Sequence, residues 1–186
     1  AKRLPEYYDL KNTEDIQVLT PMKKSEIGTI ELNKKLQEVL NPKRPAIEEI
    51  SYGDKVFREK DKVMQIKNNY DIYWEKEISG KNTGRLTKEM GNGVFNGEIG
   101  TIINIDEKEK KVGIQFDDEK IVEYEFSELD QIEHSYAITI HKAQGSEFDV
   151  VIMVIPPTAP MLLTRNLLYT GITRAKKLLV IISTDK

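Results

Sequence analysis

The chain contains no cysteine and only two histidines among its 186 residues. A disulfide framework and a thiolate metal site are therefore excluded, and two histidines are too few for a histidine-based metal cluster. No apolar run approaches the roughly 18 residues of a membrane-spanning helix, and no signal peptide is visible. The composition predicts a cytoplasmic protein with no metal site and no membrane span.

An excess of positive charge is also missing. The 28 Lys and Arg residues are outnumbered by 31 Asp and Glu residues, which gives a formal net charge of −3. A global field that attracts nucleic acid is excluded, so any nucleic-acid binding must come from a local site. The apolar fraction of 39% is compatible with a packed core, and the length fits one domain with a small insert.

Two separate stretches have the pattern of an α/β domain. Their apolar runs and helical periodicities predict strands at 15–21, 148–155 and 178–183 and helices at 25–42 and 162–177. Ser135 has the position of a cap for a further helix over 136–144 that ends at Gly145. The alternation of Tyr136, Ile138 and Ile140 fits a strand in the same place.

The middle of the chain has a different pattern. Residues 53–71 alternate apolar and charged side chains like a half-buried strand, and residues 74–93 are polar and predict a mobile loop. Residues 96–126 contain three short β-rich runs, which suggest a small SH3-like barrel. The predicted domains are 1–60 (first part of the α/β domain), 61–93 (connecting strand and mobile loop), 94–132 (β insert) and 133–186 (second part).

Polar residues crowd in front of the apolar strand at 148–155. Gly145 permits close approach of a phosphate or ribose, and Glu147 can accept hydrogen bonds from two ribose hydroxyls. Thr139, His141 and Lys142 can donate to nucleic-acid phosphates. Composition alone favours the plainer interpretation, which is a capped helix end with a solvated polar rim.

A second constellation is the segment LLYTGITRAKK, residues 167–177. A fixed guanidinium at Arg174 can stabilise charge on a transferring phosphoryl group. The alternative is that Arg174, Lys176 and Lys177 only complement the dipole at a helix C-terminus. Taken alone, the segment is a weak indication of function.

The order of the two constellations is more specific. TIHKAQGSEFDVVI, followed about 20 residues later by NLLYTGITRAKKLLVII, resembles motifs V and VI of superfamily 1 helicases. The form HKAQGSEFD resembles the RecD/TraA branch, which includes the alpha chain of exodeoxyribonuclease V and its stand-alone relatives. The segments VLTPMKKSEIGTIELNKKLQEVLNP and DKVMQIKNNYD with VFNGEIGTI resemble that branch's motif IV region and the approach to its SH3-like insert. The resemblance runs from about residue 15 to the end.

The resemblance implies the second RecA-like (P-loop NTPase-type) domain of a helicase, with a parallel sheet interrupted by an SH3-like β-barrel. The sequence has no G-x-x-x-x-G-K-[ST] motif, so the phosphate cradle and Mg²⁺ ligands are expected on a first RecA-like domain. The chain therefore looks like a C-terminal fragment that is inactive alone. The implied parent is an ATP- and Mg²⁺-dependent DNA helicase moving 5′-to-3′ on single-stranded DNA in recombination or repair.

The resemblance also implies roles for individual residues. Arg174 matches the arginine finger on the γ-phosphate, Glu147 matches the ribose contact, and Gln144 and Gly145 lie beside the nucleotide. Arg165 is a candidate second arginine of the cleft, although an ordinary ion pair explains it equally well. The implied partners are single-stranded DNA, the N-terminal RecA-like domain and other exodeoxyribonuclease V subunits.

The remaining implied contacts are with DNA. By the match to motif V, Thr139, His141 and Lys142 contact single-stranded DNA phosphates or link DNA to the ATP cleft. Lys23 and Lys24 follow the motif IV strand, but solvated surface lysines are the simpler interpretation. The insert over 94–132 is acidic, which argues against a DNA grip by its whole surface.

Three alternatives stay open. The first is a non-catalytic module that binds single-stranded DNA or a protein. The second is an α/β domain with decayed motifs, against which the intact blocks argue. The third is a complete enzyme of another kind, for which the sequence offers no Ser/His/Asp constellation.

Overall fold

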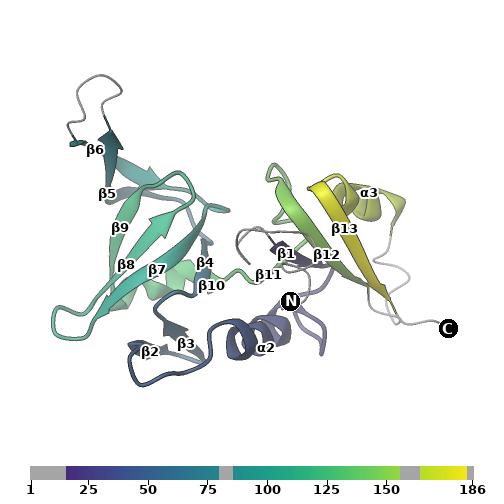
Figure 1. Cartoon of the computed structure of the whole chain (residues 1–186), viewed down its shortest axis with the longest axis horizontal. Coiled ribbons are helices and arrows are strands. Elements are labelled where there is room, and N and C mark those ends of the chain that lie inside the picture. The colour runs from purple at the N-terminus through teal and green to yellow at the C-terminus, as the bar shows by residue number, and fades with distance from the viewer. Residues whose placement is uncertain (1–15, 80–85, 156–163, 184–186) are drawn as a thin grey trace. The chain divides into compact units, whose positions relative to one another are not determined.

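The computed structural model describes residues 16–79, 86–155 and 164–183, and the chain forms two compact units (Figure 1). The α/β unit joins the segment before residue 41 to the segment after residue 135, and the β unit comprises residues 41–135 between them. An α/β domain interrupted by β-rich residues is therefore confirmed. The interruption is wider than the predicted insert over 94–132.

The sheet of the α/β unit has four strands in the order β11-β1-β12-β13, and every neighbouring pair is parallel. Its elements are β1 (Ile16–Thr20), α2 (Thr29–Leu40), β11 (Ala137–Thr139), β12 (Phe148–Ile155), α3 (Arg165–Ile172) and β13 (Ala175–Ser183). The middle strands β1 and β12 are mainly apolar and largely buried, as expected for strands covered on both faces. The predicted strand at 148–155 is confirmed to the residue.

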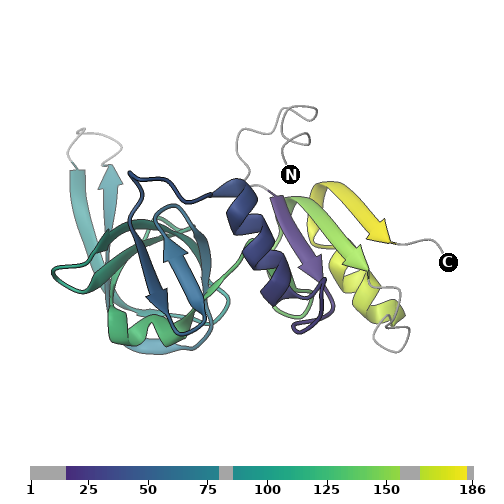
Figure 2. The same ribbon diagram turned by 90° about the horizontal axis from the view of Figure 1, so that it is seen from below.

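The two helices cover opposite faces of this sheet. Leu32 and Leu36 of α2 pack against the core face that includes Ile152. Gly171 of α3 lies against the next residue, Met153, so closely that an added Cβ would be 2.5 Å from its Cε atom. Successive strand residues point to opposite faces, so α2 and α3 lie on different sides. Figure 2 shows α2 beside β1, and α3 beside β12 and β13.

The predicted helix over 136–144 is wrong. Residues 137–139 form β11, whose Ala137 and Ile138 pair with Val18 and Leu19 of β1, and turns follow over 140–145. Pairing with β1 provides hydrogen-bond partners for the backbone of this segment, whereas an isolated helix of nine residues is marginal. The rival strand interpretation is the correct one up to Thr139.

The other α/β elements keep their predicted type but change their ends. The helix predicted at 25–42 begins at Thr29, because residues 21–28 form turns in which the Gly28 N–H bonds to the Ser25 carbonyl at 2.9 Å. The last strand begins at Ala175, earlier than predicted, and α3 is correspondingly short. Strand β13 therefore includes Lys176 and Lys177, which were predicted as helix and lie at an irregularity between the Phe148–Ala175 and Val150–Leu178 pairs.

The β unit contains a seven-stranded antiparallel sheet in the order β10-β4-β7-β8-β9-β5-β6, together with the hairpin β2-β3. Its elements are β2 (Glu49–Tyr52), β3 (Lys55–Arg58), β4 (Lys62–Gln65), β5 (Asn69–Ser79), β6 (Leu86–Val94), β7 (Ile99–Asp106), β8 (Lys111–Phe116), β9 (Ile121–Glu125), the 3-10 helix η2 (Phe126–Gln131) and β10 (Ile132–His134). The strands surround one apolar core, as Figure 2 shows. Predicted β runs at 96–126 are confirmed as β7, β8 and β9.

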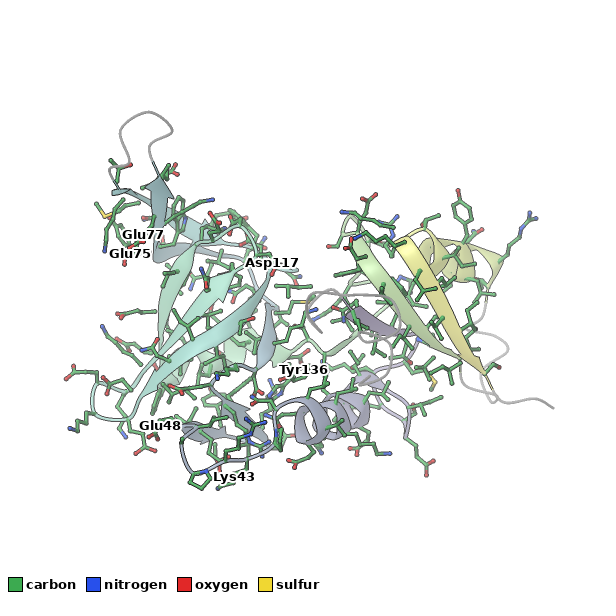
Figure 3. The ribbon with its side chains drawn as sticks, viewed as in Figure 1. Lys43, Glu48, Glu75, Glu77, Asp117 and Tyr136 are labelled. Atoms are coloured by element: carbon green, nitrogen blue, oxygen red, sulfur yellow. The ribbon has the colours of Figure 1, made fainter. Side chains whose placement is uncertain are left out.

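The mobile loop predicted over 74–93 is wrong for the parts of this range that the structure describes, which are 74–79 and 86–93. Those residues continue β5 and form β6, paired from Trp74–Gly91 to Ile78–Thr87. An added Cβ at Gly91 would lie 2.5 Å from the Trp74 ring, so the glycine makes room for the indole. Figure 3 labels Glu75 on this hairpin, and its carboxylate lies 3.0 Å from the Lys88 ammonium. Exposed polar residues dominate the hairpin, so no apolar alternation marks it in the sequence.

The predicted connecting region at 61–93 and the strand predicted at 53–71 also change. The latter contains β3, β4 and the start of β5, and all three strands belong to the β unit over 41–135. The second α/β segment begins at Tyr136, which Figure 3 labels and whose carbonyl accepts the Val18 N–H at 3.3 Å. The predicted restart at 133 is therefore close to the observed one.

Candidate functional site

The predicted site residues lie at two opposite edges of the parallel sheet. Thr139 pairs with Thr20 where β11 and β1 end, so it marks the carboxyl edge. Phe148 pairs with Ala175 where β12 and β13 begin, so this pair marks the amino edge. Residues 140–147, called the crossing loop below, therefore run from one edge to the other. The candidate DNA residues lie around the start of this loop, and the candidate nucleotide residues Gln144, Gly145 and Glu147 lie near its end.

Arg174 is fixed at the amino edge by three hydrogen bonds. Its Nε donates to the Thr170 carbonyl at 3.1 Å, its Nη1 to the Ser146 carbonyl at 3.0 Å, and its Nη2 to the Thr173 hydroxyl at 3.1 Å. The guanidinium is half-buried. The two sequence constellations are thus in direct contact, because Ser146 belongs to the crossing loop and Arg174 follows α3.

A backbone bond reinforces this contact. The Phe148 N–H donates to the Arg174 carbonyl at 2.8 Å, which aligns the starts of β12 and β13. The position of the guanidinium therefore follows from sheet pairing as well as from side-chain bonds. Ser146 and Thr173 were missed by sequence reasoning as neighbours of Arg174, although Thr173 precedes it directly in the chain.

The other residues proposed to contact the nucleotide lie on the crossing loop, on either side of Ser146. Gly145 has φ of +87°, in the left-handed region that favours glycine, and an added Cβ would meet nothing within 4 Å. The side chains of Gln144 and Glu147 are exposed. The Glu147 carboxylate lies 3.6 Å from the Lys176 ammonium, and this pair is open to solvent. The loop thus offers an uncovered backbone at Gly145 and an exposed carboxylate at Glu147, on either side of Ser146, whose carbonyl accepts a hydrogen bond from Arg174.

The DNA candidates lie together at the carboxyl edge. The Thr139 hydroxyl accepts a hydrogen bond from the Lys142 N–H at 3.3 Å, which tightens the turn, and His141 is exposed. The Ile140 N–H donates to the Thr20 carbonyl at 3.1 Å, so this turn begins beside the segment that carries the exposed Lys23. Phosphate contacts are chemically possible here, because donors are abundant.

Arg165 is not brought to Arg174. It is the first residue of α3, exposed at the helix N-terminus, where the Thr164 hydroxyl accepts the Leu167 N–H at 3.2 Å. A helix of this length spans roughly 12 Å at 1.5 Å per residue. The two arginines therefore occupy opposite ends of α3.

The described residues contain neither a candidate metal site nor a candidate membrane-spanning helix. Across 16–79, 86–155 and 164–183, no group of three or more His, Cys, Asp or Glu side chains is arranged to hold a metal ion. In the same part of the chain, no helix has the length and apolar character needed to cross a membrane.

Known protein families match parts of both units. Residues 32–116 match the family described as the SH3 domain of ATP-dependent RecD-like DNA helicases. Residues 134–182 match the family of UvrD-like helicase C-terminal domains. The chain contains a RecD-like SH3 domain and a UvrD-like helicase C-terminal domain.

Individual relatives match most of the chain. The chain is 35% identical over 179 residues to the uncharacterized protein MJ1519 of Methanocaldococcus jannaschii, covering 90% of this chain and 14% of that protein. It is 34% identical over 161 residues to the ATP-dependent RecD2 DNA helicase of Deinococcus radiodurans, covering 87% of this chain and 19% of the relative. The chain thus spans less than a fifth of either relative.

A solved helicase has the same fold. The crystal structure of Bacteroides Pif1 bound to single-stranded DNA superimposes with a TM-score of 0.57 at 13% identity, over 95% of this chain and 42% of that one. The predicted RecA-like helicase domain with an SH3-like insert is therefore confirmed as the fold of the chain. The roles of single residues are a separate question.

Proposed function

We propose that this chain completes the ATP site of a DNA helicase, with Arg174 as the arginine finger. The observation that carries the proposal is the guanidinium held by the carbonyl of Ser146, 28 positions earlier in the chain. A guanidinium fixed in advance stabilises charge that develops on a transferring phosphoryl group without reorganising at that moment. The proposed hydrolysis requires ATP, Mg²⁺ and an N-terminal RecA-like domain that carries the Mg²⁺ ligands.

The crossing loop supplies the proposed nucleotide contacts. Glu147 accepts hydrogen bonds from the ribose hydroxyls, and Gln144 and Gly145 lie beside the nucleotide. Support comes from the exposure of both side chains and from the open space around Gly145, where a Cβ would touch nothing. Arg165 is a weaker candidate for this site, because it lies at the far end of α3.

The carboxyl edge supplies the proposed DNA contacts. Thr139, His141 and Lys142 bind phosphates of single-stranded DNA, with little sequence readout. The crossing loop is only eight residues long and joins these contacts to the carbonyl that holds Arg174. A shift of the loop on DNA binding therefore reaches the finger directly, which accounts for DNA-stimulated hydrolysis.

The wider role follows from the family. We propose 5′-to-3′ movement on single-stranded DNA, a role in recombination or repair, and a location in the cytoplasm. Each round of ATP binding and hydrolysis closes and opens the cleft and moves the grip along the strand. Other subunits of an exodeoxyribonuclease V assembly are proposed partners. This chain alone, without the phosphate-binding motif, is expected to be inactive as an ATPase.

The test is DNA-stimulated ATP hydrolysis by the full-length protein with the substitution Arg174→Ala. Removal of an arginine finger is expected to lower the rate by about 10³- to 10⁵-fold while nucleotide affinity changes little. Arg44→Ala is the matched control, because Arg44 is an exposed arginine of the β unit. Equal rates for Arg174→Ala and the control would remove Arg174 from the mechanism.

A second candidate function is a non-catalytic module that binds single-stranded DNA. Tyr70, Tyr73 and Phe95 of the β unit are 66%, 56% and 43% exposed, and the Tyr70 and Phe95 rings lie 5.6 Å apart. Exposed aromatic rings can stack on bases of any sequence. Binding of a labelled oligonucleotide by this chain, weakened several-fold by Tyr70→Ala and unaffected by Ile103→Ala, is the expected result for this function. Absence of binding excludes it for the chain alone.

A further inference from the structure

The hydroxyl of Thr173 occupies a position between α3 and the guanidinium of Arg174. It donates to the Thr170 carbonyl at 3.0 Å and accepts from Arg174 Nη2 at 3.1 Å. A hydroxyl has one hydrogen to donate and lone pairs to accept, so both bonds form at once. The Thr170 carbonyl also accepts from Arg174 Nε at 3.1 Å, which closes a ring of bonds at the end of the helix.

The backbone at this point is fixed as well. Thr173 is the C-cap of α3, with φ of −72° and ψ of −4°, and its N–H donates to the Tyr169 carbonyl at 3.0 Å. The Arg174 N–H donates to the Gly171 carbonyl at 3.2 Å. The threonine therefore has little freedom to move its hydroxyl away. Its side chain is half-buried, which limits competition from solvent.

The bonds leave part of the guanidinium available. A guanidinium has five N–H donors: one on Nε and two on each terminal nitrogen. Within 16–79, 86–155 and 164–183, three of the five have an acceptor, and one donor on Nη1 and one on Nη2 remain. A donor on each terminal nitrogen is therefore left to bind the oxygens of a phosphoryl group.

We infer that Thr173 is a positioning residue that orients Arg174 toward the phosphate, an inference that rests on the proposed role of Arg174. The Thr173 hydroxyl holds the terminal nitrogen on the side of α3, while the Ser146 carbonyl holds the other terminal nitrogen on the side of the crossing loop. With the Nε bond to the Thr170 carbonyl, the guanidinium is held at all three nitrogens, and loss of the Thr173 hydroxyl leaves Nη2 without its anchor. The hydroxyl thus acts through Arg174 and makes no contact with substrate itself.

The experiment compares Thr173→Val with Thr173→Ser in the full-length protein. Valine keeps the branched shape and removes the hydroxyl, and serine restores it. Loss of a hydrogen bond to a charged group predicts a fall in kcat of about ten- to a hundredfold for Thr173→Val, with KM for ATP unchanged. Thr173→Ser is expected to retain kcat within a few-fold. Thermal unfolding of both variants checks that the fold is intact.

A double-variant cycle separates positioning from a purely structural role. If Thr173 acts through Arg174, adding Thr173→Val to Arg174→Ala causes no further loss of kcat. A loss of the same size in both backgrounds, or normal kcat in Thr173→Val while Arg174→Ala is inactive, overturns the inference and leaves the proposed function standing. Full activity of Arg174→Ala instead overturns the proposed function, and the inference with it.

Discussion

Substituting Asn33 by alanine tests how the fold supports the candidate DNA contacts. Asn33 lies on α2, and its side chain binds both backbone groups of Ala137: Nδ2 donates to the carbonyl at 2.9 Å, and Oδ1 accepts from the N–H at 2.8 Å. Strand β11 is the edge strand of its sheet and pairs with β1 alone in the described part of the chain. The amide of Asn33 thus takes the place of a neighbouring strand, two residues before Thr139.

The expected cost follows from burial. Ala137 is 1% exposed and Asn33 is 8% exposed, so water does not replace the lost partner easily. Each buried backbone group left without a partner costs about 1–3 kcal/mol. Alanine is a better helix former than asparagine by roughly 0.5 kcal/mol, which offsets a small part. Asn33→Ala should therefore lower the free energy of unfolding of the α/β unit by about 1.5–5.5 kcal/mol.

The assay must report on the α/β unit. The only tryptophan, Trp74, lies in the β unit, so its fluorescence does not follow this part directly. Urea unfolding followed by far-ultraviolet circular dichroism gives the total, and amide hydrogen exchange at Ala137 gives the local effect. Lys34→Ala is the control, since Lys34 is exposed on the same helix, and a change within about 0.5 kcal/mol is expected. A loss below about 1 kcal/mol for Asn33→Ala, with Ala137 still protected, would refute the reasoning.

Two further predictions concern the core of the β unit. Tyr124 is fully buried, and its hydroxyl donates to Gln65 Oε1 at 3.0 Å. Tyr124→Phe should therefore lower the free energy of unfolding by about 1–3 kcal/mol, measured by urea unfolding followed by Trp74 fluorescence. An unchanged urea midpoint would contradict this. Burial, followed by the nearby charges of Glu128 and Glu98, raises the pKa of Tyr124 above its ordinary value of 10.0. The unfolded chain therefore releases this proton first, and the free energy of unfolding should decline as the pH rises above about 10. Comparison of wild type with Tyr124→Phe between pH 8 and 11 should show a shallower decline in the variant, and equal slopes would exclude Tyr124 as the cause.

The sequence predicted correctly the strands whose side chains are buried on both faces of the sheet. Residues 148–155 form a strand whose centre is buried on both faces, and the apolar run from Val150 to Ile155 indicates this directly. The β5-β6 hairpin was missed for the opposite reason. Its outer residues are largely exposed, so neighbouring positions carry similar polar side chains and no period of two appears.

The site was predictable in its residue types and not in its geometry. The segments around Gly145 and Arg174 were recognisable from order and spacing. The bond between Arg174 and the Ser146 carbonyl depends on the pairing of β12 with β13, which no local pattern contains. Similarly, the family resemblance made Arg165 a candidate second arginine of the cleft, with an ordinary ion pair as an equal alternative, and the structure places it at the opposite end of α3 from Arg174.

The most direct test of the central claim is the single-turnover rate of ATP hydrolysis in the full-length protein bound to single-stranded DNA. Single-turnover conditions isolate the chemical step from product release. The account predicts that Arg174→Ala slows this step by about 10³-fold or more, while the dissociation constant for ATP stays within a few-fold of wild type. A wild-type single-turnover rate in Arg174→Ala would contradict the account and assign Arg174 to the stability of the α3 terminus alone.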